Sequence, residues 1–408
     1  MSDIFKSITG KSRTLYKVSE DGTDDLRNIV IISSEFPPGP GGIGKHAFDL
    51  SRALVWKGFE ITVFSSQDYA SEEEILNFRQ TFPSNLNLVR FSRNGWATYL
   101  DRWLLINNFL TKHNPELIIV TGRFPLWMGW LVKRKFGKSI PVHAFIHGSE
   151  LSKKNRFHHF LTSVSLSSID HIWAVSNFTR RLLRKLTDRK DILVLPNGLW
   201  LNDWPSENIK KSAVELTGVP SLITVGRVSS RKGQHLLVKA LPEIQKLFPA
   251  VHYNLVGIPT GKEALEAIAV QYHVADDLTF HGKIPSIIGL SDYYQKSDVF
   301  IMLSETQPDG DTEGFGIAIL EANYFGKPAI GARGCGIEDA IMDGYNGRLV
   351  EGNNPIEIAE ALKDIMENYN AYSARARKWA IRHDWKILID HFIKLEDVPF
   401  LTNINYEV

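Results

Sequence analysis

The sequence predicts an α/β protein with two doubly wound domains that face each other across a cleft. Short apolar runs rich in β-branched residues alternate with longer amphipathic stretches, which is typical of βα units in parallel sheets. The alternation occurs as two series, separated at 199–220 by a segment rich in Asn, Pro, Lys and Glu. A length of 408 residues also favours two domains over one.

The first series belongs to an N-terminal domain expected at residues 1–199. Its strands are predicted at 28–34, 60–66, 86–91, 116–121, 141–147, 171–176 and 192–195. Residues 1–27 are polar and lack a strong period, so we treat them as a tail without regular structure.

The second series belongs to a C-terminal domain expected at residues 200–384. Its strands are predicted at 221–227, 252–256, 278–281, 299–303, 328–332 and 347–350. Farther along the chain, an amphipathic helix is indicated by the spacing of Trp379, Trp385, Ile389 and Phe392.

Composition excludes several classes of protein. A chain with 43% hydrophobic and 23% charged residues is neither disordered nor fibrous. The single cysteine, Cys335, cannot form an intrachain disulfide, and no N-terminal segment resembles a secretory signal. No run reaches the length of apolar sequence that a membrane span needs. We therefore expect a cytoplasmic protein, soluble or at most peripheral at the inner face of the cell membrane.

Charge is distributed unevenly along the chain. Residues 1–200 contain 27 Lys and Arg against 18 Asp and Glu, whereas the remainder contains 20 against 28. A basic half favours a phosphate-bearing ligand or an anionic membrane surface, although solvated helix faces would account for the excess equally simply.

A glycine-rich segment at 39–44 allows two interpretations. It satisfies G-x-G-x-x-G after a predicted strand, and Asp68 lies near the spacing of a ribose-binding acid, as in NAD-dependent oxidoreductases. However, the insertion 35–38 contains two prolines, whereas the dinucleotide motif requires a tight strand-to-helix turn. In either case the glycines would let backbone N–H groups approach an anion at the start of a helix.

Two further motifs stand at the ends of predicted strands. Arg227 and Lys232 lie in the turn after the first strand of the second domain, where two cations can converge on one diphosphate. His147 ends the strand 141–147, at the edge where open α/β sheets bind ligands. Taken alone, each motif also fits a structural or solvated role.

The segment 308–322 is a polar, glycine-broken loop that leads into a helix predicted to start near Phe315. Glu313 precedes this helix and Glu321 lies within it. Such a segment presents free helix N–H groups, a positive dipole end and two carboxylates to one ligand.

Together these motifs, in this order, resemble the retaining glycosyltransferases of family 4, also called group 1, which have the GT-B fold. The resemblance implies transfer of a hexose from a nucleotide diphosphate sugar, UDP- or GDP-linked, to a hydroxyl group. It also implies front-face attack with retention and no metal or other cofactor. Asp309 and Asp311 match the spacing of a metal-binding Asp-x-Asp, but they do not end a strand.

The resemblance also implies roles for individual residues. Those with a catalytic role are His147, Glu313, Arg227 and Lys232. Those that contact the donor are Gly42, Arg227, Lys232, Glu313, Phe315, Gly316, Ile317, Ala318 and Glu321. A C-terminal helix at about 385–408 is expected to return to the first domain. Ser176 and Glu338 also match family positions, although Cys335 interrupts the usual glycine pair.

The acceptor is less defined by the sequence. The stretch 123–138 mixes Trp127 and Trp130 with cations, as membrane-surface helices do, and a second basic face is formed by Arg180, Arg181, Arg184 and Lys185. We expect a glycan or lipid-linked acceptor used in polysaccharide or glycolipid biosynthesis, possible contact with an anionic membrane, and no nucleic acid. A sugar-nucleotide epimerase, a non-catalytic carbohydrate-binding protein and an oxidoreductase stay open as alternatives.

Overall fold

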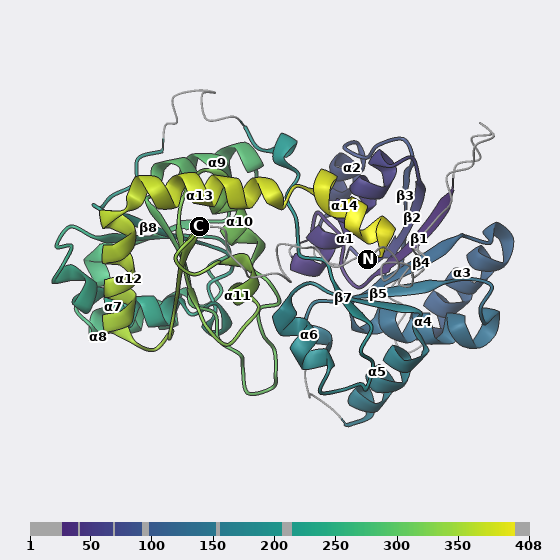
Figure 1. Cartoon of the computed structure of the whole chain (residues 1–408). Helices are drawn as coiled ribbons and strands as arrows, with labels where there is room; N and C mark the ends of the chain where they lie inside the picture. The colour runs from purple at the N-terminus through teal and green to yellow at the C-terminus, as the bar shows by residue number, and fades with distance from the viewer. Residues whose placement is uncertain are drawn as a thin grey trace, which may run out of the picture.

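The computed structural model describes residues 27–39, 41–67, 70–91, 98–151, 156–205 and 214–395. They form two parallel sheets, each in its own domain (Figure 1). The first sheet has the strand order β3-β2-β1-β4-β5-β6-β7 and the second β10-β9-β8-β11-β12-β13. Every strand predicted from the sequence is present, and the two doubly wound domains confirm the predicted fold class.

The elements of the first domain alternate regularly between strand and helix. Its strands are β1 (Asn28–Ser33), β2 (Glu60–Ser65), β3 (Leu86–Arg90), β4 (Leu117–Thr121), β5 (Val142–Ile146), β6 (His171–Ala174) and β7 (Ile192–Val194). Its helices are α1 (Gly42–Trp56), α2 (Glu72–Arg79), α3 (Thr98–His113), α4 (Arg123–Phe136), α5 (Arg156–Ser168) and α6 (Asn177–Leu183).

The second domain repeats this plan. Its strands are β8 (Ser221–Val225), β9 (His252–Val256), β10 (Leu278–Gly282), β11 (Val299–Met302), β12 (Ala329–Ala332) and β13 (Gly347–Val350). Its helices are α7 (Gln234–Gln245), α8 (Lys262–Gln271), α9 (Ile287–Lys296), α10 (Ile317–Tyr324), α11 (Ile337–Ala340), α12 (Pro355–Glu367) and α13 (Tyr369–Arg382).

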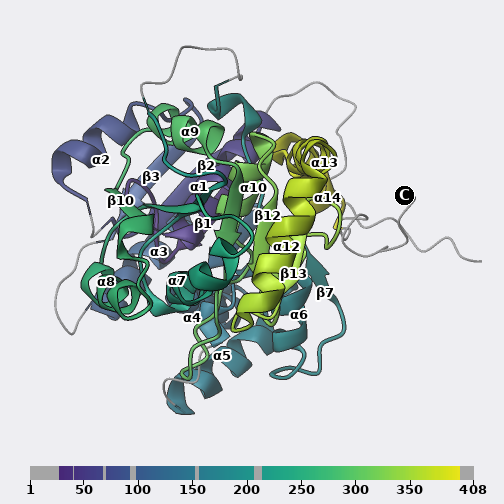
Figure 2. The same ribbon diagram turned by 90° about the vertical axis from the view of Figure 1, so that its left-hand side faces the viewer.

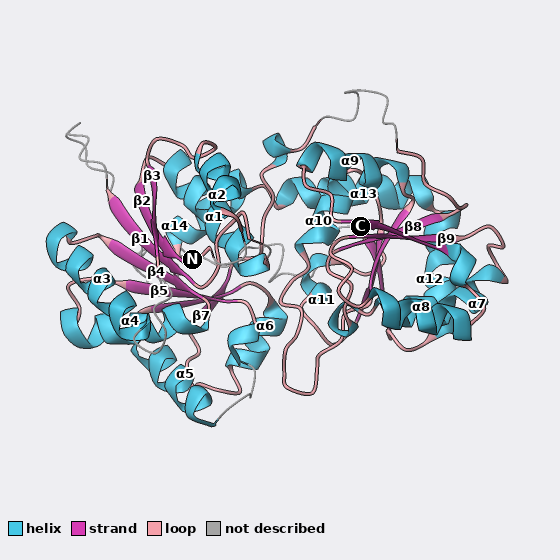
Figure 3. Ribbon diagram, turned by 180° about the vertical axis from the view of Figure 1, so that it is seen from behind, coloured by secondary structure: helices cyan, strands magenta, loops and turns pink. Residues whose placement is uncertain are grey.

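Helices cover both faces of each sheet (Figure 3). This is why strands such as β4 (LIIVT) and β5 (VHAFI) are buried along their whole length and are apolar without alternation. In parallel sheets of this kind the carboxyl ends of the strands form the ligand-binding edge. The strand-end motifs of the two domains consequently face one another.

The chain crosses between the domains twice, and the two crossings are hydrogen-bonded to each other. The N–H of Leu199 donates to the carbonyl of His383 at 2.8 Å, and the N–H of Trp385 donates to the carbonyl of Leu199 at 3.0 Å. After the second crossing, α14 (Trp385–Lys394) packs on α1 and contributes to the core of the first domain (Figures 1 and 2). Residues beyond 395 lie outside the described part of the chain.

Within the described residues, no helix combines the length and the apolar character that crossing a bilayer requires.

Candidate active site

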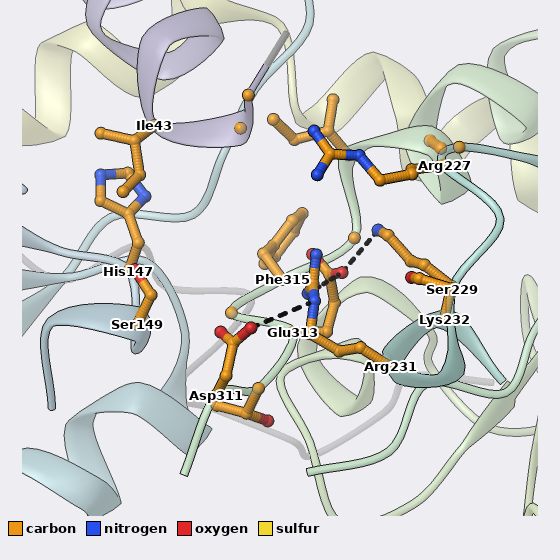
Figure 4. A pocket seen from close by; sticks show the side chains of 18 of the residues that line it. Ile43, His147, Ser149, Arg227, Ser229, Arg231, Lys232, Asp311, Glu313 and Phe315 are labelled. Carbon is orange, nitrogen blue, oxygen red and sulfur yellow. Dashed lines mark hydrogen bonds and ion pairs between the residues drawn. The ribbon is translucent and has the colours of Figure 1, made fainter. Parts of the chain in front are cut away.

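A cleft of about 710 Å³ lies between the two domains (Figure 4). The first domain contributes the α1 loop, His147 and Ser149 to its wall. The second domain contributes the turn 226–232 and the loop 307–318. The structure therefore brings together motifs that are up to 276 residues apart in the sequence, Gly42 and Ala318 included.

Glu313 is held by two cations of the neighbouring turn. Its Oε2 accepts a hydrogen bond from Lys232 Nζ at 2.6 Å and another from Arg231 Nη1 at 2.9 Å. Burial by itself would raise the pKa of Glu313, but Lys232 and Arg231 outweigh burial and lower it to about 2. The carboxylate is consequently ionised and a weak base, suited to accepting hydrogen bonds and poorly suited to removing a proton.

The N-terminus of α10 opens into the cleft beside this carboxylate. The helix begins at Ile317, two residues later than predicted, because Gly316 adopts a left-handed φ of 95° and Phe315 is buried in the core. The N–H of Ile319 donates to the carbonyl of Gly316, so the N–H groups of Ile317 and Ala318 lie ahead of the first helical hydrogen bond. Both residues line the cleft, where such groups favour an anion.

Arg227 supplies a third cation to the same wall. Its side chain is exposed and extends into the cleft from the turn after β8 (Figure 4). Its positive charge partly counters the effect of burial on the pKa of Glu35, in the first domain.

His147 stands at the opposite wall, at the end of β5. Its side chain is buried, and its Nε2 lies 2.8 Å from Thr121 Oγ1, which fixes the plane of the ring. Burial lowers the pKa of His147 to about 3, so the imidazole is neutral at pH 7. A neutral ring in this position can exchange hydrogen bonds with an uncharged sugar and does not carry the charge of a general acid.

A close contact between the two domains aligns His147 with Glu313. A Cβ atom on Gly314 would come within 2.0 Å of the His147 carbonyl oxygen, so only glycine permits this approach. Gly148 also lies against Thr312 and Gly314. The loop that carries Glu313 thus rests directly on the strand end that carries His147.

The glycine loop before α1 carries a carboxylate that the sequence did not single out. Gly42 lines the cleft and has open space around it, as its predicted contact with a diphosphate requires. Glu35 also lines the cleft, accepts a hydrogen bond from the N–H of Gly44, and lies so close to Gly41 that a side chain there would require the Glu35 carboxylate to move. Burial raises the pKa of Glu35. Asp68, part of the dinucleotide interpretation, lies outside the described residues.

Other predicted residues occupy positions away from the cleft. Glu321 is not one of the described residues that line the cleft. Its Oε2 accepts a hydrogen bond from Tyr294 Oη at 2.7 Å. Its contact with ribose stays a prediction. Ser176 caps α6 by accepting the N–H of Thr179, and Glu338 pairs with Arg181 across the domains at 2.7 Å.

The Asp-x-Asp candidate is engaged with protein groups. Asp309 Oδ1 accepts the N–H of Asp311, whose own carboxylate lies 3.6 Å from Arg231. In the described part of the chain, no three His, Cys, Asp or Glu side chains converge as a metal-ligand set would.

Comparisons with known proteins place this geometry in a family. Residues 40–202 match the model of Glycosyltransferase Family 4, and residues 205–381 match that of Glycosyl transferases group 1. A GDP-mannose-dependent alpha-(1-6)-phosphatidylinositol monomannoside mannosyltransferase of Mycobacterium tuberculosis is 30% identical over 378 residues, which are 88% of this chain and 95% of that protein. The chain belongs to the family 4 glycosyltransferases. The homologous enzyme of Mycolicibacterium smegmatis is 26% identical over 370 residues, 86% of this chain and 94% of that one.

Solved structures show the same fold. Sucrose-phosphate synthase of Thermosynechococcus elongatus superimposes with a TM-score of 0.74 at 19% identity, covering 90% of this chain and 98% of that one. HepE of Anabaena, in complex with UDP and glucose, gives 0.71 at 19% identity over the same shares. The fold of this glycosyltransferase is therefore GT-B, and the family excludes the oxidoreductase interpretation of residues 39–44.

Several residues of the glycosyltransferase cleft were missed by reasoning from sequence. Arg231 was not singled out from the sequence, yet it binds Glu313 directly. Asn197 lines the cleft, and its buried Oδ1 has no hydrogen-bond partner among the described residues. Glu150 lies behind His147, accepts the N–H of His147 at 3.1 Å, and has a pKa raised to about 7 by burial. Only the spacing His147-x-x-Glu150, which places an acid one turn after the strand end, could have indicated such a partner.

The predicted membrane-facing stretch is only partly exposed. Trp127 and Trp130 are half-buried, and Lys133 is tied to Asp170 at 2.8 Å. In the second basic face, Arg181 forms the pair with Glu338 described above. The cations that remain exposed on α4 are Arg134 and Lys135.

Proposed function

We propose that this glycosyltransferase moves mannose from GDP-mannose to a hydroxyl group of a lipid-linked glycan acceptor, with retention of configuration and without a metal ion. The donor proposal is supported by the Mycobacterium relatives, whose names specify GDP-mannose and a phosphatidylinositol mannoside acceptor. A UDP-linked hexose is the second candidate, because HepE was solved with UDP-glucose. The product would enter glycolipid or polysaccharide biosynthesis in the cytoplasm, at the inner membrane face.

The observation that carries the proposal is the anchoring of Glu313 by Lys232 and Arg231 beside the free N-terminus of α10. A diphosphate that leaves a sugar develops negative charge on its terminal oxygen, and preorganised cations stabilise that charge. Arg227, Lys232 and the N–H groups of Ile317 and Ala318 face the same part of the cleft. The proposal of metal independence rests on these groups, because they offer the positive charge that a divalent ion would otherwise supply.

In this proposal each wall of the cleft contacts one side of the transferred sugar. Glu313, ionised and a weak base, would accept hydrogen bonds from sugar hydroxyl groups without becoming a covalent nucleophile. His147, neutral and oriented by Thr121, would bind the sugar near its anomeric carbon from the first domain. The acceptor hydroxyl would then enter from the same face as the departing phosphate, whose oxygen would take its proton.

Ligand-induced stabilisation tests the donor first. GDP-mannose, UDP-glucose, ADP-glucose and NADH would each be added to the purified protein and the unfolding temperature measured. A ligand at about a hundredfold its dissociation constant adds roughly 2.7 kcal/mol to stability. We expect the shift with GDP-mannose, and its loss in Arg227→Ala. A shift with NADH alone would overturn the proposal.

Transfer assays test the chemistry. With a phosphatidylinositol mannoside as acceptor and GDP-mannose as donor, the anomeric configuration of the product is read by NMR, with and without EDTA. Retention and resistance to EDTA are expected. Inversion would overturn the mechanism, dependence on a divalent ion would overturn metal independence, and release of a free epimerised sugar without acceptor would favour an epimerase.

A further inference from the structure

The N-terminus of α1 is capped by a carboxylate from the preceding loop. The N-cap residue is Gly41, which has no side chain to accept a hydrogen bond. The N–H of Lys45 donates to the carbonyl of Gly41 at 3.1 Å, and the N–H of Gly44 lies ahead of this helical hydrogen bond. Glu35 accepts the N–H of Gly44 and so takes the place of a capping side chain.

The glycines of this turn leave room for the Glu35 side chain. A Cβ atom on Gly44 would lie 3.2 Å from Glu35 Cβ, and a Cβ atom on Gly41 would lie 1.9 Å from Glu35 Oε2. The side chain of Glu35 therefore extends along the turn from Gly44 to Gly41. Gly42, in contrast, has open space beside it. One part of the helix start is thus covered by the carboxylate, and the next part is open to the cleft.

The carboxylate lies among groups that suit an anionic ligand. Glu35, Gly41 and Gly42 line the cleft, and Arg227 extends into it from the opposite wall (Figure 4). The charge of Arg227 acts on the Glu35 carboxyl group and lowers its pKa, against the larger effect of burial. A helix start and a guanidinium are groups that bind phosphate. A diphosphate beside Gly42 would consequently meet the negative charge of Glu35, and like charges in a partly buried site disfavour each other.

The charged groups around Glu35 come from four elements. Lys45 of α1 forms an ion pair within its own helix, and the guanidinium of Arg227 stays charged throughout the physiological range. His147, at the end of β5, is neutral because its pKa is about 3, and Glu313, before α10, is ionised because its pKa is about 2. Burial raises the pKa of Glu35. Of these five residues, Glu35 is therefore the one whose charge a bound diphosphate would change most readily.

We propose that Glu35 fills part of the diphosphate site in the free protein, and that the donor binds there with uptake of one proton by the Glu35 carboxyl group. The proton comes from water, and no covalent bond of the donor changes in this step. A protonated carboxyl group donates a hydrogen bond to a phosphate oxygen, whereas a carboxylate only accepts hydrogen bonds. The presence of a nucleotide diphosphate sugar rests on the proposed function, but its base and sugar do not matter here.

Calorimetric titration of the whole protein with GDP-mannose, without acceptor, tests this proposal. Binding heats measured at one pH in two buffers of different ionisation enthalpy give the number of protons taken up. GDP-mannose is the suitable probe because its diphosphate is esterified at both ends and does not titrate near neutral pH, unlike the terminal phosphate of GDP. We expect uptake that approaches one proton at about pH 8, with a Kd that rises by at most about tenfold per pH unit. Binding of GDP-mannose without proton uptake would overturn the proposal.

The variant Glu35→Gln removes the titrating group and keeps its shape. The amide oxygen can still accept the N–H of Gly44, and an unaltered unfolding temperature would verify the fold. We expect no proton uptake, a Kd that does not depend on pH, and binding at least roughly threefold tighter than wild type at about pH 8. Proton uptake equal to that of the wild type would show that another group is responsible and would overturn the proposal. The proton count of the wild type does not depend on this variant.

Two control variants identify the group that takes up the proton. Glu150→Gln removes the carboxyl group behind His147, whose pKa of about 7 makes it the competing source of uptake. Asp311→Asn removes an acid that lines the cleft on the opposite wall. Both variants should take up a proton as the wild type does. Loss of uptake in Glu150→Gln, with uptake retained in Glu35→Gln, would overturn the assignment to Glu35.

Failure of this proposal and failure of the proposed function give different results. If GDP-mannose binds without proton uptake, the donor assignment stands and the role of Glu35 is refuted. If GDP-mannose does not bind but UDP-glucose binds with uptake that Glu35→Gln abolishes, the donor assignment fails and the role of Glu35 stands. Binding of neither nucleotide sugar would overturn both.

Discussion

The two walls of the cleft differ in the ionisation of their side chains. The side chains of the wall from the second domain are charged. Lys232 and Arg231 hold Glu313 ionised with a pKa lowered to about 2, and Arg227 extends beside them. The wall from the first domain suppresses ionisation instead. There, burial lowers the pKa of His147 to about 3 and raises the pKa of Glu35.

We infer from this difference that the two domains would bind different parts of the substrates. A diphosphate leaving group is charged, so cations that already have a partner in Glu313 can stabilise it with little rearrangement. Sugar and acceptor hydroxyl groups are uncharged, so a neutral wall can bind them without desolvating an ion. The following predictions test whether the two walls act in these separate ways.

The largest effect is expected from the charged wall. Lys232→Ala should lower kcat/KM roughly 10²–10³-fold, because it removes a preorganised donor at the position where leaving-group charge develops. Stabilisation by the nucleotide sugar should fall as well. Steady-state kinetics and thermal unfolding measure both effects.

The matched control for this variant is Lys246→Ala, at the far end of α7. That lysine is exposed and pairs with Glu243, which lies one turn earlier in α7. If both substitutions reduced activity to the same degree, the charged wall would have no special role.

The next effect belongs to the neutral wall and concerns stability. Burial raises the pKa of Glu150 from 4.5 in the unfolded chain to about 7 in the folded protein. The folded protein therefore holds this proton more tightly, and the resulting contribution to the free energy of unfolding is fully present below pH 4.5 and is lost as the pH rises through about 7. A shift of this size corresponds to on the order of 3 kcal/mol in the free energy of unfolding. In Glu150→Gln this pH dependence should disappear.

Urea unfolding at several pH values between about 4.5 and 8 measures this loss. Glu73→Gln, an exposed acid on α2, serves as the control and should unfold with the wild-type pH dependence. If Glu150→Gln also behaved like the wild type, the carboxyl group would not be held protonated by burial.

A smaller effect is expected for His147. His147→Ala should lower kcat about 10- to 100-fold, because it removes a hydrogen-bonding group of the sugar site. Since burial lowers the pKa of His147 to about 3, kcat of the wild type should show no histidine inflection near pH 6.5. If kcat of the wild type did show an inflection near that pH, and the inflection vanished in the variant, His147 would have an acid-base role. That result would contradict the inference that His147 is neutral. His113→Ala, on the exposed end of α3, provides the control.

Much of this organisation could be predicted from the sequence, because parallel strands leave a strong local signal. All strands appear where apolar β-branched runs predicted them, and nine predicted residues line the cleft because motifs at strand ends share one edge of a sheet. The exception is Glu321, which faces Tyr294. The start of α10 was placed two residues early because the left-handed turn at Gly316 has no unambiguous sequence signal.

Three of the missed residues share a different property. Glu35, Arg231 and Asp339 act through partners that are distant in the chain or in the other domain. Their chemistry depends on which segments meet in space, and neither periodicity nor spacing contains that information.

The smallest effect concerns the contact that sets the distance between the walls. Asp339 of α11 accepts hydrogen bonds from the N–H groups of Asn177 and Phe178 at 2.9 and 3.1 Å, and so caps α6 from the other domain. The same segment is tied to the donor loop, since the N–H of Gly336 donates to the Glu313 carbonyl at 2.8 Å. Asp339→Ala should weaken closure by about 1–2 kcal/mol, as loss of a helix cap does.

Weaker closure should raise the KM for the donor about fivefold or more while changing kcat little, because the charged wall itself is intact. Small-angle scattering should show a more extended free protein that becomes compact when donor is added. Arg181→Ala removes the ion pair with Glu338 and the contact of the guanidinium with the Phe178 ring, and it should cost less than about 1 kcal/mol because the arginine is exposed. If Asp339→Ala lowered kcat and left KM unchanged, α11 would act on the charged wall itself, and the two walls would not be separable.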